Sequence, residues 1–347
     1  MVDLASVNSA PAVRRPAVEL RFGDADAEAW AEALVSVTVE AGIGPGVDAV
    51  EVIAAAGNGG PAAAVGDAGT VALGYDDASA EQVFAGEVES VGRSIHGTIR
   101  ITAVNGGAAL ARLRLNRSYE QQAAGDVISD LAGEAGVATA TIEAGVDLPF
   151  YVVDDRRTAW EHVAALARRS GCWSYFIPDG ELEVVAVETG PAVQTFTYGE
   201  DILGIEMAEA TPLVSGVRAV GEGAAGSEGD EAWCWLVKDP SGVSAEAGDE
   251  PRREVPDPAL RSADAATTAA EGHLASAGLL EVTGRLLVPG SPAVVPGATI
   301  EIADAPEESL NGSFLVRHVR HRYAKGAGFI TLIAFSKAAG GAGGGLP

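Results

Sequence analysis

Two stretches of this sequence alternate apolar and polar residues with a period of two, and the two patterns can be laid over each other. Such alternation, interrupted by clusters of Gly, Asn and Asp, is typical of short antiparallel strands. The overlay matches Val88 with Val316 and Gly97 with Gly328. The strands that it aligns are Thr70–Leu73 with Thr299–Ile302, and Gly97–Ala103 with Gly328–Ala334. We therefore expect the chain to contain one β-fold twice.

A duplicated β-fold has a geometric consequence for assembly. Closed rotational symmetry is the usual arrangement of identical chains, and three such chains around one axis would present six similar modules. A trimer of this chain could thus imitate a hexamer.

The segment between the two β stretches has a helical period instead. Asp126–Leu131 spaces its apolar residues for one helical face, and Gly136 is a suitable stop. A second helix is expected to begin at Thr158, which can form a capping box with Glu161, and to end before Gly171. Strands are expected on both sides of a Pro178–Gly180 turn, at Trp173–Ile177 and Leu182–Val187. The pattern predicts a helix laid on a β-hairpin.

An acidic segment over residues 221–257 interrupts the second β stretch. Its many acids, Gly and Ser favour a long exposed loop around one short strand, Trp233–Val237. A helix is expected to start after the cap residue Ser262 and to run to about Ala277.

The predicted fold class is mainly β, with an α+β insertion. We expect two similar β-barrel-like domains, over residues 15–116 and 191–337, and between them a helix-hairpin domain over 117–190. The second β domain includes the acidic loop and the helix at 263–277, and residues 338–347 are expected to be a flexible Gly-rich tail.

Charge excludes one broad class of function. The chain has 23 Lys and Arg against 49 Asp and Glu, a net charge of −26, so no surface that neutralises nucleic-acid phosphates is expected. No apolar run is long enough to span a bilayer, which predicts no membrane segment. The N-terminal residues carry no apolar core of an export signal, and we expect the protein to begin in the cytoplasm.

A cysteine-nucleophile site is the first catalytic alternative. It would use Cys172 as nucleophile, His162 as base and Asp154 or Asp155 to orient the base. No protease signature surrounds Cys172, and a Cys between Gly171 and Trp173 at a helix-to-strand corner is more typical of packing. We therefore expect a scaffold here, with no catalytic residue and no bound cofactor.

The spacing of His318 and His321 suggests a metal site, but residues three apart on a strand face opposite ways. We expect no metal there. A basic cluster surrounds these histidines, in the order Arg317, Arg320, Arg322 and Lys325. Two interpretations stand: a solvated strand edge, or a docking site for an acidic neighbouring subunit.

Several short patterns resemble the phage late control protein D family, the baseplate hub of contractile tails, which also occurs as the hub portion of VgrG in type VI secretion. The resemblance covers about residues 20–337 and rests on the order of Phe84–Val88, Tyr151–Leu182, Pro296–Gly297 and Asn311–Val316. The structural signature residues within it are Phe84, Gly86, Trp160, Leu166, Gly171, Gly180, Gly297, Gly312, Phe314 and His321.

The resemblance implies a non-enzymatic homotrimer whose two barrel-like domains per chain form a pseudo-sixfold ring. Its partners would be the inner tube protein, the spike protein and other baseplate subunits, within a phage tail or a phage-derived injection system. No needle-like β-helical repeat follows the second β stretch, so the spike is expected to be a separate chain.

A second class of function is a secreted or surface carbohydrate-active enzyme or binding module built on β-sandwiches. An export signal, or exposed aromatic side chains beside a pair of carboxylates, would favour it. The chain has only 5% aromatic residues and no visible export signal, which favours the hub.

Overall fold

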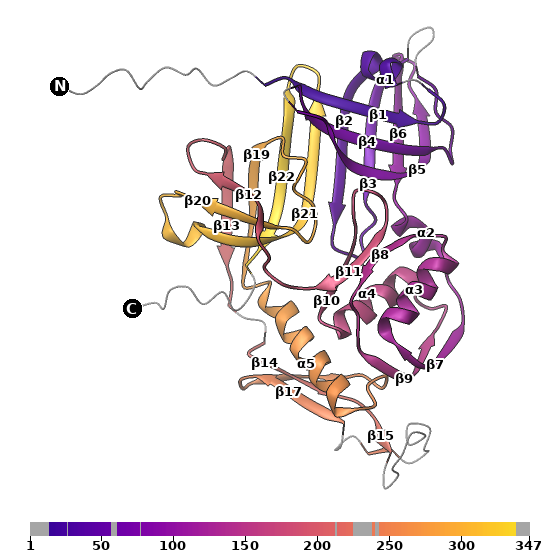
Figure 1. The fold of residues 1–347 in the computed structure, drawn as a ribbon, viewed down its shortest axis with the longest axis vertical. Helices are drawn as coiled ribbons and strands as arrows, with labels where there is room; N and C mark the ends of the chain where they lie inside the picture. The colour runs from indigo at the N-terminus through magenta and orange to yellow at the C-terminus, as the bar shows by residue number, and fades with distance from the viewer. Residues whose placement is uncertain are drawn as a thin grey trace, which may run out of the picture.

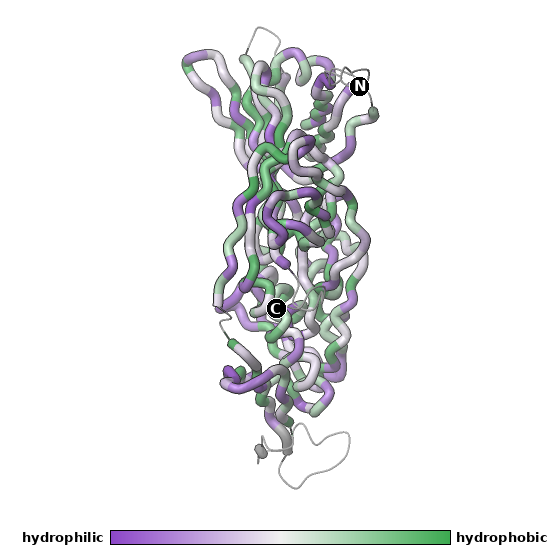
Figure 2. The backbone as a smooth tube through the Cα atoms, turned by 90° about the vertical axis from the view of Figure 1, so that its left-hand side faces the viewer, coloured by the Kyte–Doolittle hydropathy of each residue, from purple (hydrophilic) through white to green (hydrophobic). Residues whose placement is uncertain are grey.

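The computed structural model describes residues 14–25, 27–56, 61–76, 78–211, 214–224, 238–239 and 243–337. The fold is mainly β, as predicted, and strands are more numerous than helices in the described residues. The molecule is elongated (Figure 2), with its N-terminal strands at one end and residues of the acidic segment at the other (Figure 1). None of the helices in the described ranges has the length and apolar character needed to cross a lipid bilayer.

The N-terminal module consists of six strands and one short helix, α1. Its strand order is β1-β4-β5-β6-β3-β2, with antiparallel pairing throughout. The elements are β1 (Pro16–Phe22), α1 (Ala27–Ala33), β2 (Leu34–Gly42), β3 (Ala49–Ala55), β4 (Ala68–Tyr75), β5 (Glu81–Arg93) and β6 (Thr98–Val104).

The C-terminal module repeats this strand order as β12-β20-β21-β22-β19-β13. Each strand occupies the place of one strand of the N-terminal module, although β12 pairs with β20 in parallel whereas β1 pairs with β4 antiparallel. The elements are β12 (Ala192–Thr197), β13 (Gly204–Glu209), β19 (Val282–Pro289), β20 (Thr299–Ala303), a 3₁₀ turn (Glu308–Leu310), β21 (Gly312–Ala324) and β22 (Gly328–Ser336). The chain therefore builds the same sheet topology twice.

The longest strands of the two modules correspond in detail. β5 and β21 are both 13 residues long, and each carries a β-bulge, between Val88 and Ser90 in β5 and between Val316 and His318 in β21. In the next strand the sequence overlay was wrong by one residue. It placed Ile101 on Leu332, but Ile101 pairs with Val91 and Ile333 pairs with Val319. A slip of one residue exchanges the two faces of a strand, and Ile101 and Ile333 both face a core.

The two modules are joined into a single sheet of 12 strands (Figure 1). The join is the antiparallel pairing of β2 with the second half of β21, from Ser36 opposite Ala324 to Gly42 opposite His318. Each module keeps its own core: Phe22, Trp30 and Ile101 lie in one, and Phe314 and Phe335 lie in the other.

A helix-hairpin unit packs beside this sheet. Thr158 accepts a hydrogen bond from the Glu161 backbone while the Glu161 carboxylate accepts one from the Thr158 backbone, so the predicted capping box is confirmed. Gly171 has the left-handed φ of +68° that stops the helix. The elements are α2 (Gly107–Arg112), β7 (Arg117–Ala123), α3 (Ala124–Glu134), β8 (Thr139–Ile142), β9 (Asp147–Val153), α4 (Ala159–Arg169), β10 (Cys172–Phe176) and β11 (Leu182–Ala186).

An insert between β13 and β19 has no counterpart in the N-terminal module. Its elements are β14 (Gly216–Val220), β15 (Gly223–Ala224), β16 (Lys238–Asp239), β17 (Ser244–Gly248), β18 (Arg252–Pro256) and α5 (Ala263–Gly278). The expectation of an exposed loop is wrong for residues 243–257, because β17 and β18 flank β14 in a three-stranded sheet. The helix after Ser262 is confirmed, whereas the strand expected at Trp233–Val237 and the tail at 338–347 lie outside the described residues.

The insert packs onto the helix-hairpin unit through a common core. Val217, Leu260 and Ala269 of the insert belong to the same buried cluster as Val163 and Leu166 of α4. A largely buried ion pair between Arg169 and Asp257 also connects the two units, and both side chains are 13% exposed.

Thr158→Ala should destabilise the protein by about 1 kcal/mol, because it removes the side-chain acceptor of the α4 capping box. Urea unfolding monitored by circular dichroism measures this difference. Thr267→Ala is the matched control, since Thr267 is exposed inside α5 and alanine is a better helix former there. An equal loss of stability in both variants would contradict a specific role for the cap.

Candidate assembly interface

The helix-hairpin unit meets the N-terminal module at the loop after β2. The indole Nε1 of Trp160 donates a hydrogen bond to the Gly46 carbonyl at 2.8 Å, and the Gly44 backbone N–H donates to the Ser174 carbonyl at 2.7 Å. Gly44 is required here, because a Cβ at this position would lie 2.6 Å from the Trp160 ring. Trp160 itself packs edge-on against Phe176, with 5.6 Å between the ring centroids.

Three signature glycines lie where separate parts of the chain come close together. A Cβ at Gly297 would lie 2.5 Å from the ring of Tyr175, at the contact between the C-terminal module and the hairpin. Gly180 lies against Ala85 of β5, and Gly171 lies against Gly272 of α5. The hairpin unit thus touches both modules and the insert at glycines. Gly297 leaves no room for a side chain, whereas Gly180 and Gly171 have the left-handed φ of +85° and +68° that favours glycine.

The remaining signature residues are either buried or at positions where the backbone requires glycine. A Cβ at Gly86 would lie 2.3 Å from the Val104 carbonyl, and Gly312 has a φ of +129° that other residues rarely adopt. The other five side chains are 4% exposed or less, namely Phe84, Trp160, Leu166, Phe314 and His321. All ten positions therefore have packing or backbone reasons, and none of them presents a chemical group to solvent.

A buried carboxyl lies at the point where the hairpin and both modules meet. Asp48 accepts hydrogen bonds from the Gly42 backbone at 2.9 Å and from the Asn105 amide at 2.8 Å. Burial raises the pKa of Asp48 to about 7, although both hydrogen bonds act in the opposite direction. Phe176 and His321 line the same small cavity, so the carboxyl has apolar and aromatic neighbours.

The geometry around Cys172 does not form a nucleophile site. Burial raises the pKa of the Cys172 thiol to about 11, and its Sγ contacts the Ser170 carbonyl at 3.4 Å. The two ring nitrogens of His162 are taken by the Tyr151 hydroxyl at 2.9 Å and by the Asp154 carbonyl at 3.1 Å. A catalytic thiol needs a lowered pKa and a base that can take its proton, but the pKa of Cys172 is raised and both ring nitrogens of His162 already have other partners.

The two histidines on β21 face opposite sides of the strand, as predicted. His321 is 1% exposed and its Nδ1 lies 2.9 Å from the Thr331 hydroxyl, while His318 is exposed. Burial lowers the pKa of His321 to about 4, which keeps the ring neutral. Among the residues that the structure describes, no group of three or more His, Cys, Asp or Glu could hold a metal ion.

Two members of the basic cluster on β21 make contacts across the junction of the modules. Arg320 forms an ion pair with Glu40 of β2, and Lys325 donates a hydrogen bond to the Glu32 carbonyl of α1 at 2.8 Å. Both therefore hold the C-terminal module against the N-terminal one. Arg322 is exposed on the same outer face of the sheet.

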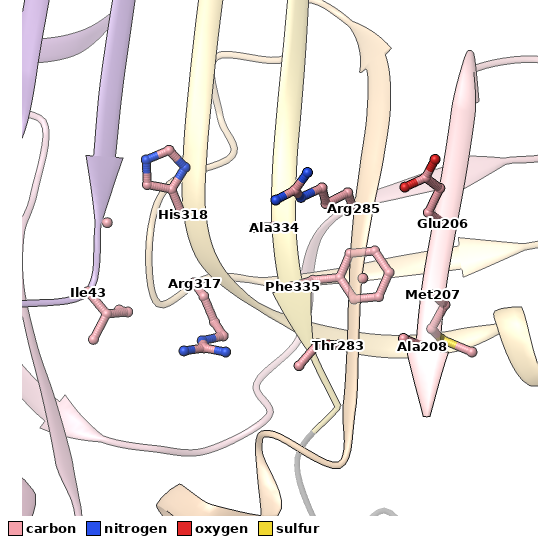
Figure 3. A pocket seen from close by; sticks show the side chains of 12 residues that line it. Ile43, Glu206, Met207, Ala208, Thr283, Arg285, Arg317, His318, Ala334 and Phe335 are labelled. Carbon is pink, nitrogen blue, oxygen red and sulfur yellow. The ribbon is translucent and has the colours of Figure 1, made fainter. Parts of the chain in front are cut away.

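Arg317 lies at the bulge of β21 and faces an open hollow of about 650 Å³ (Figure 3). The hollow lies on the outer face of the C-terminal module, where Arg285, His318 and Phe335 surround it and Glu206 of β13 forms its far side. Its positive groups are unusual for so acidic a chain. The docking interpretation of Arg317, Arg320, Arg322 and Lys325 stays a prediction.

No protein-family profile and no curated protein matches the sequence. Solved structures match along most of the chain. A 43 kDa tail protein of prophage MuSo2 from Shewanella oneidensis aligns with a TM-score of 0.69 and 14% identity, over 93% of this chain and 98% of that one. A tail protein from Neisseria meningitidis aligns with a TM-score of 0.68 and 16% identity, over 93% and 97%.

A component of the Escherichia coli type VI secretion system, described as structurally similar to two bacteriophage T4 tail proteins, also matches. It aligns with a TM-score of 0.62 and 9% identity, over 93% of this chain and 77% of that one. At these identities the likeness establishes the fold, and this chain has the fold of phage tail proteins.

Asp48→Asn should stabilise the protein increasingly as the pH rises from about 4 to about 8. A carboxyl whose folded pKa is raised from 3.8 to about 7 stabilises the fold at low pH, and that contribution is lost as the pH rises through 7. The free energy of unfolding should shift in favour of the variant by up to about 4 kcal/mol, at about 1.4 kcal/mol per pKa unit.

Chemical denaturation of both proteins across this pH range measures the shift. The exposed Asp249→Asn controls for the loss of one negative charge. A difference between Asp48→Asn and the parent chain that is constant with pH would contradict the buried-carboxyl interpretation.

Proposed function

We propose that this protein is a structural baseplate hub subunit of a contractile phage tail or of a phage-derived contractile injection system. It works as a homotrimer that joins the hexameric inner tube to the trimeric spike. The observation that carries the proposal is the strand order that occurs twice in one continuous sheet. The fold shared with phage tail proteins supports it.

Symmetry matching is the proposed mechanism. The two modules are similar, so three chains offer six similar β modules to the tube protein. The helix-hairpin unit and the insert each occur once per chain, so they offer three equal surfaces to the spike. The modules and the insert lie toward opposite ends of the molecule (Figure 1), which supports a tube contact at one end and a spike contact at the other.

The proposed role is structural rather than enzymatic. Its signature residues serve packing, and the joint around Trp160 and Asp48 holds the modules and the hairpin unit at fixed positions. A rigid subunit suits an adaptor, because the tube and the spike each dictate where their contacts must lie. The protein would be made in the cytoplasm and then become part of a tail or tail-like particle, beside other baseplate subunits.

Native mass spectrometry of the full-length chain tests the stoichiometry. We expect a species of about 105 kDa, three times the 35.1 kDa chain, either for the protein alone or after addition of the tube and spike proteins from the same genome. Complexes should contain three copies of this chain for six of the tube protein. Assemblies that hold two, four or six copies of the chain, or a chain that stays monomeric with both partners present, would contradict the proposal.

A further inference from the structure

The contact between the modules within one chain is a template for a contact between chains. β2 is the last strand of the N-terminal module in the order within the sheet. It pairs with the part of β21 that follows the bulge, His318–Ala324. The first part of β21 uses the same side to pair with β20. One long strand thus serves two neighbours along one edge.

The repeated topology identifies the equivalent strands. β5 corresponds to β21, and the matching bulges place Ser90–Arg93 of β5 on His318–His321 of β21. β13 corresponds to β2. Ile205 of β13 and Val37 of β2 are equivalent, as the pairings show. Ile205 pairs with Leu286, which pairs with Ile333. In the same way Val37 pairs with Val52, which pairs with Ile101.

Both equivalent edges are open in the single chain. β4 pairs with β5 only as far as Glu87, and Val88 bonds to residues 66 and 67. Beyond Val88, no backbone of the described residues pairs with this side of β5. β13 pairs with β19 on one side, and its other side likewise has no strand partner in the described chain.

Apolar side chains on the two open edges are less buried than their equivalents in the β2–β21 contact. Val37 and Val39 of β2 are fully buried, but their equivalents on β13, Ile205 and Met207, are only half-buried. Val319 of β21 is 1% exposed, whereas its equivalent Val91 on β5 is half-buried.

Two larger apolar side chains near these edges are more exposed still. Ile95 in the turn after β5 is 97% exposed, and Leu203 just before β13 is 59% exposed. Open strand edges and exposed apolar side chains are features that folded proteins usually cover.

We infer that β13 of one copy pairs antiparallel with Ser90–Arg93 of β5 in the next copy. The inference rests on the homotrimer proposed above. Transferring the register of β2 and β21 places Ala208 opposite Gly92 and Met207 opposite Arg93. Ala208 and Gly92 are small, so neither obstructs the approach of the two backbones. The transferred register ends at Arg93, where β5 ends, so Ile95 in the following turn has no assigned partner.

The contact joins two different edges, so it is a head-to-tail contact. β13 and β5 lie on opposite sides of the sheet (Figure 1), so each copy contributes one edge of each kind. Head-to-tail contacts of this type close into a ring when the rotation between copies closes, and otherwise extend into a filament. The same strand pairing would then follow every module around the ring, alternately within and between chains.

A disulfide test can separate this contact from the trimer itself. The test variant combines Gly92→Cys with Ala208→Cys, which the transferred register places face to face. A Cβ at Gly92 has its nearest neighbour at 3.8 Å, so cysteine fits there. Cys234 is replaced by serine in all variants, while the buried Cys172 is kept. The matched control combines Glu40→Cys with Arg320→Cys, the equivalent pair within one chain.

After mild oxidation, the test variant should run as a covalent trimer on a non-reducing gel and return to monomer on reduction. Each single variant should give no cross-link, and the control pair should lose its two free thiols while remaining one chain. Native mass spectrometry under reducing conditions shows whether each variant still forms the trimer.

Three results would overturn the inference. A trimer that forms but is not cross-linked, while the control pair oxidises, would refute the strand contact and leave the proposed function standing. A covalent dimer from Ala208→Cys alone would indicate a symmetric contact between two β13 edges instead. Absence of any trimer in the parent chain, with and without the tube and spike proteins, would refute the proposed function and the contact together.

Discussion

The strand β21 determines how the whole molecule is put together. Its 13 residues are long enough to pair with β20 before the bulge and with β2 after it, so one strand belongs to the C-terminal module and also receives the N-terminal module. Backbone hydrogen bonds fix the register between strands, and a register error would reverse the buried and exposed faces. The relative position of the modules is therefore set by the backbone hydrogen bonds between β2 and β21 rather than by a flexible linker. The pairs Arg320 with Glu40 and Lys325 with Glu32 reinforce the same junction.

The helix-hairpin unit makes this arrangement rigid in a second direction. Trp160 and Ser174 hold the loop after β2, Tyr175 packs on Gly297, and Gly171 brings α4 against α5. Each contact depends on a glycine or on a buried hydrogen bond, and both tolerate little displacement. Asp48 lies in the middle of this joint. Burial raises the pKa of its carboxyl and so favours the protonated form. The joint thus combines tight packing with one group that makes its stability sensitive to pH.

Local features of the sequence predicted the local structure well. The cap at Thr158, the cap at Ser262 and the turn at Gly180 depend on residues within a few positions of one another, and all three occur as expected. The duplicated β pattern was also visible, because buried strands keep their alternation. The overlay slipped by one residue after β5, since the turns after β5 and β21 differ in length and periodicity alone does not fix register.

Features that depend on distant residues were not predicted. Glu40 and Arg320 are 280 positions apart, so no local pattern could pair them, and their contact became visible only in the fold. The sheet in the insert was mistaken for a loop because β17 uses alanine at its inward positions, and β18 joins β14 in parallel without a tight turn. The open edges of β5 and β13 have no local signal in the sequence. Whether a strand edge is open depends on whether another strand lies beside it, and that is decided by the fold.

The central claim is that one strand pairing, seen once inside the chain, is used again between chains to make threefold packing imitate sixfold packing. A cryo-electron microscopy reconstruction of the assembled protein, calculated without imposed symmetry and at a resolution that separates strands, tests it most directly. The account predicts three chains with six modules around one axis and with β13 of each chain beside β5 of the next. Copies that are not arranged in threes, or a trimer in which these two edges face solvent, would contradict it.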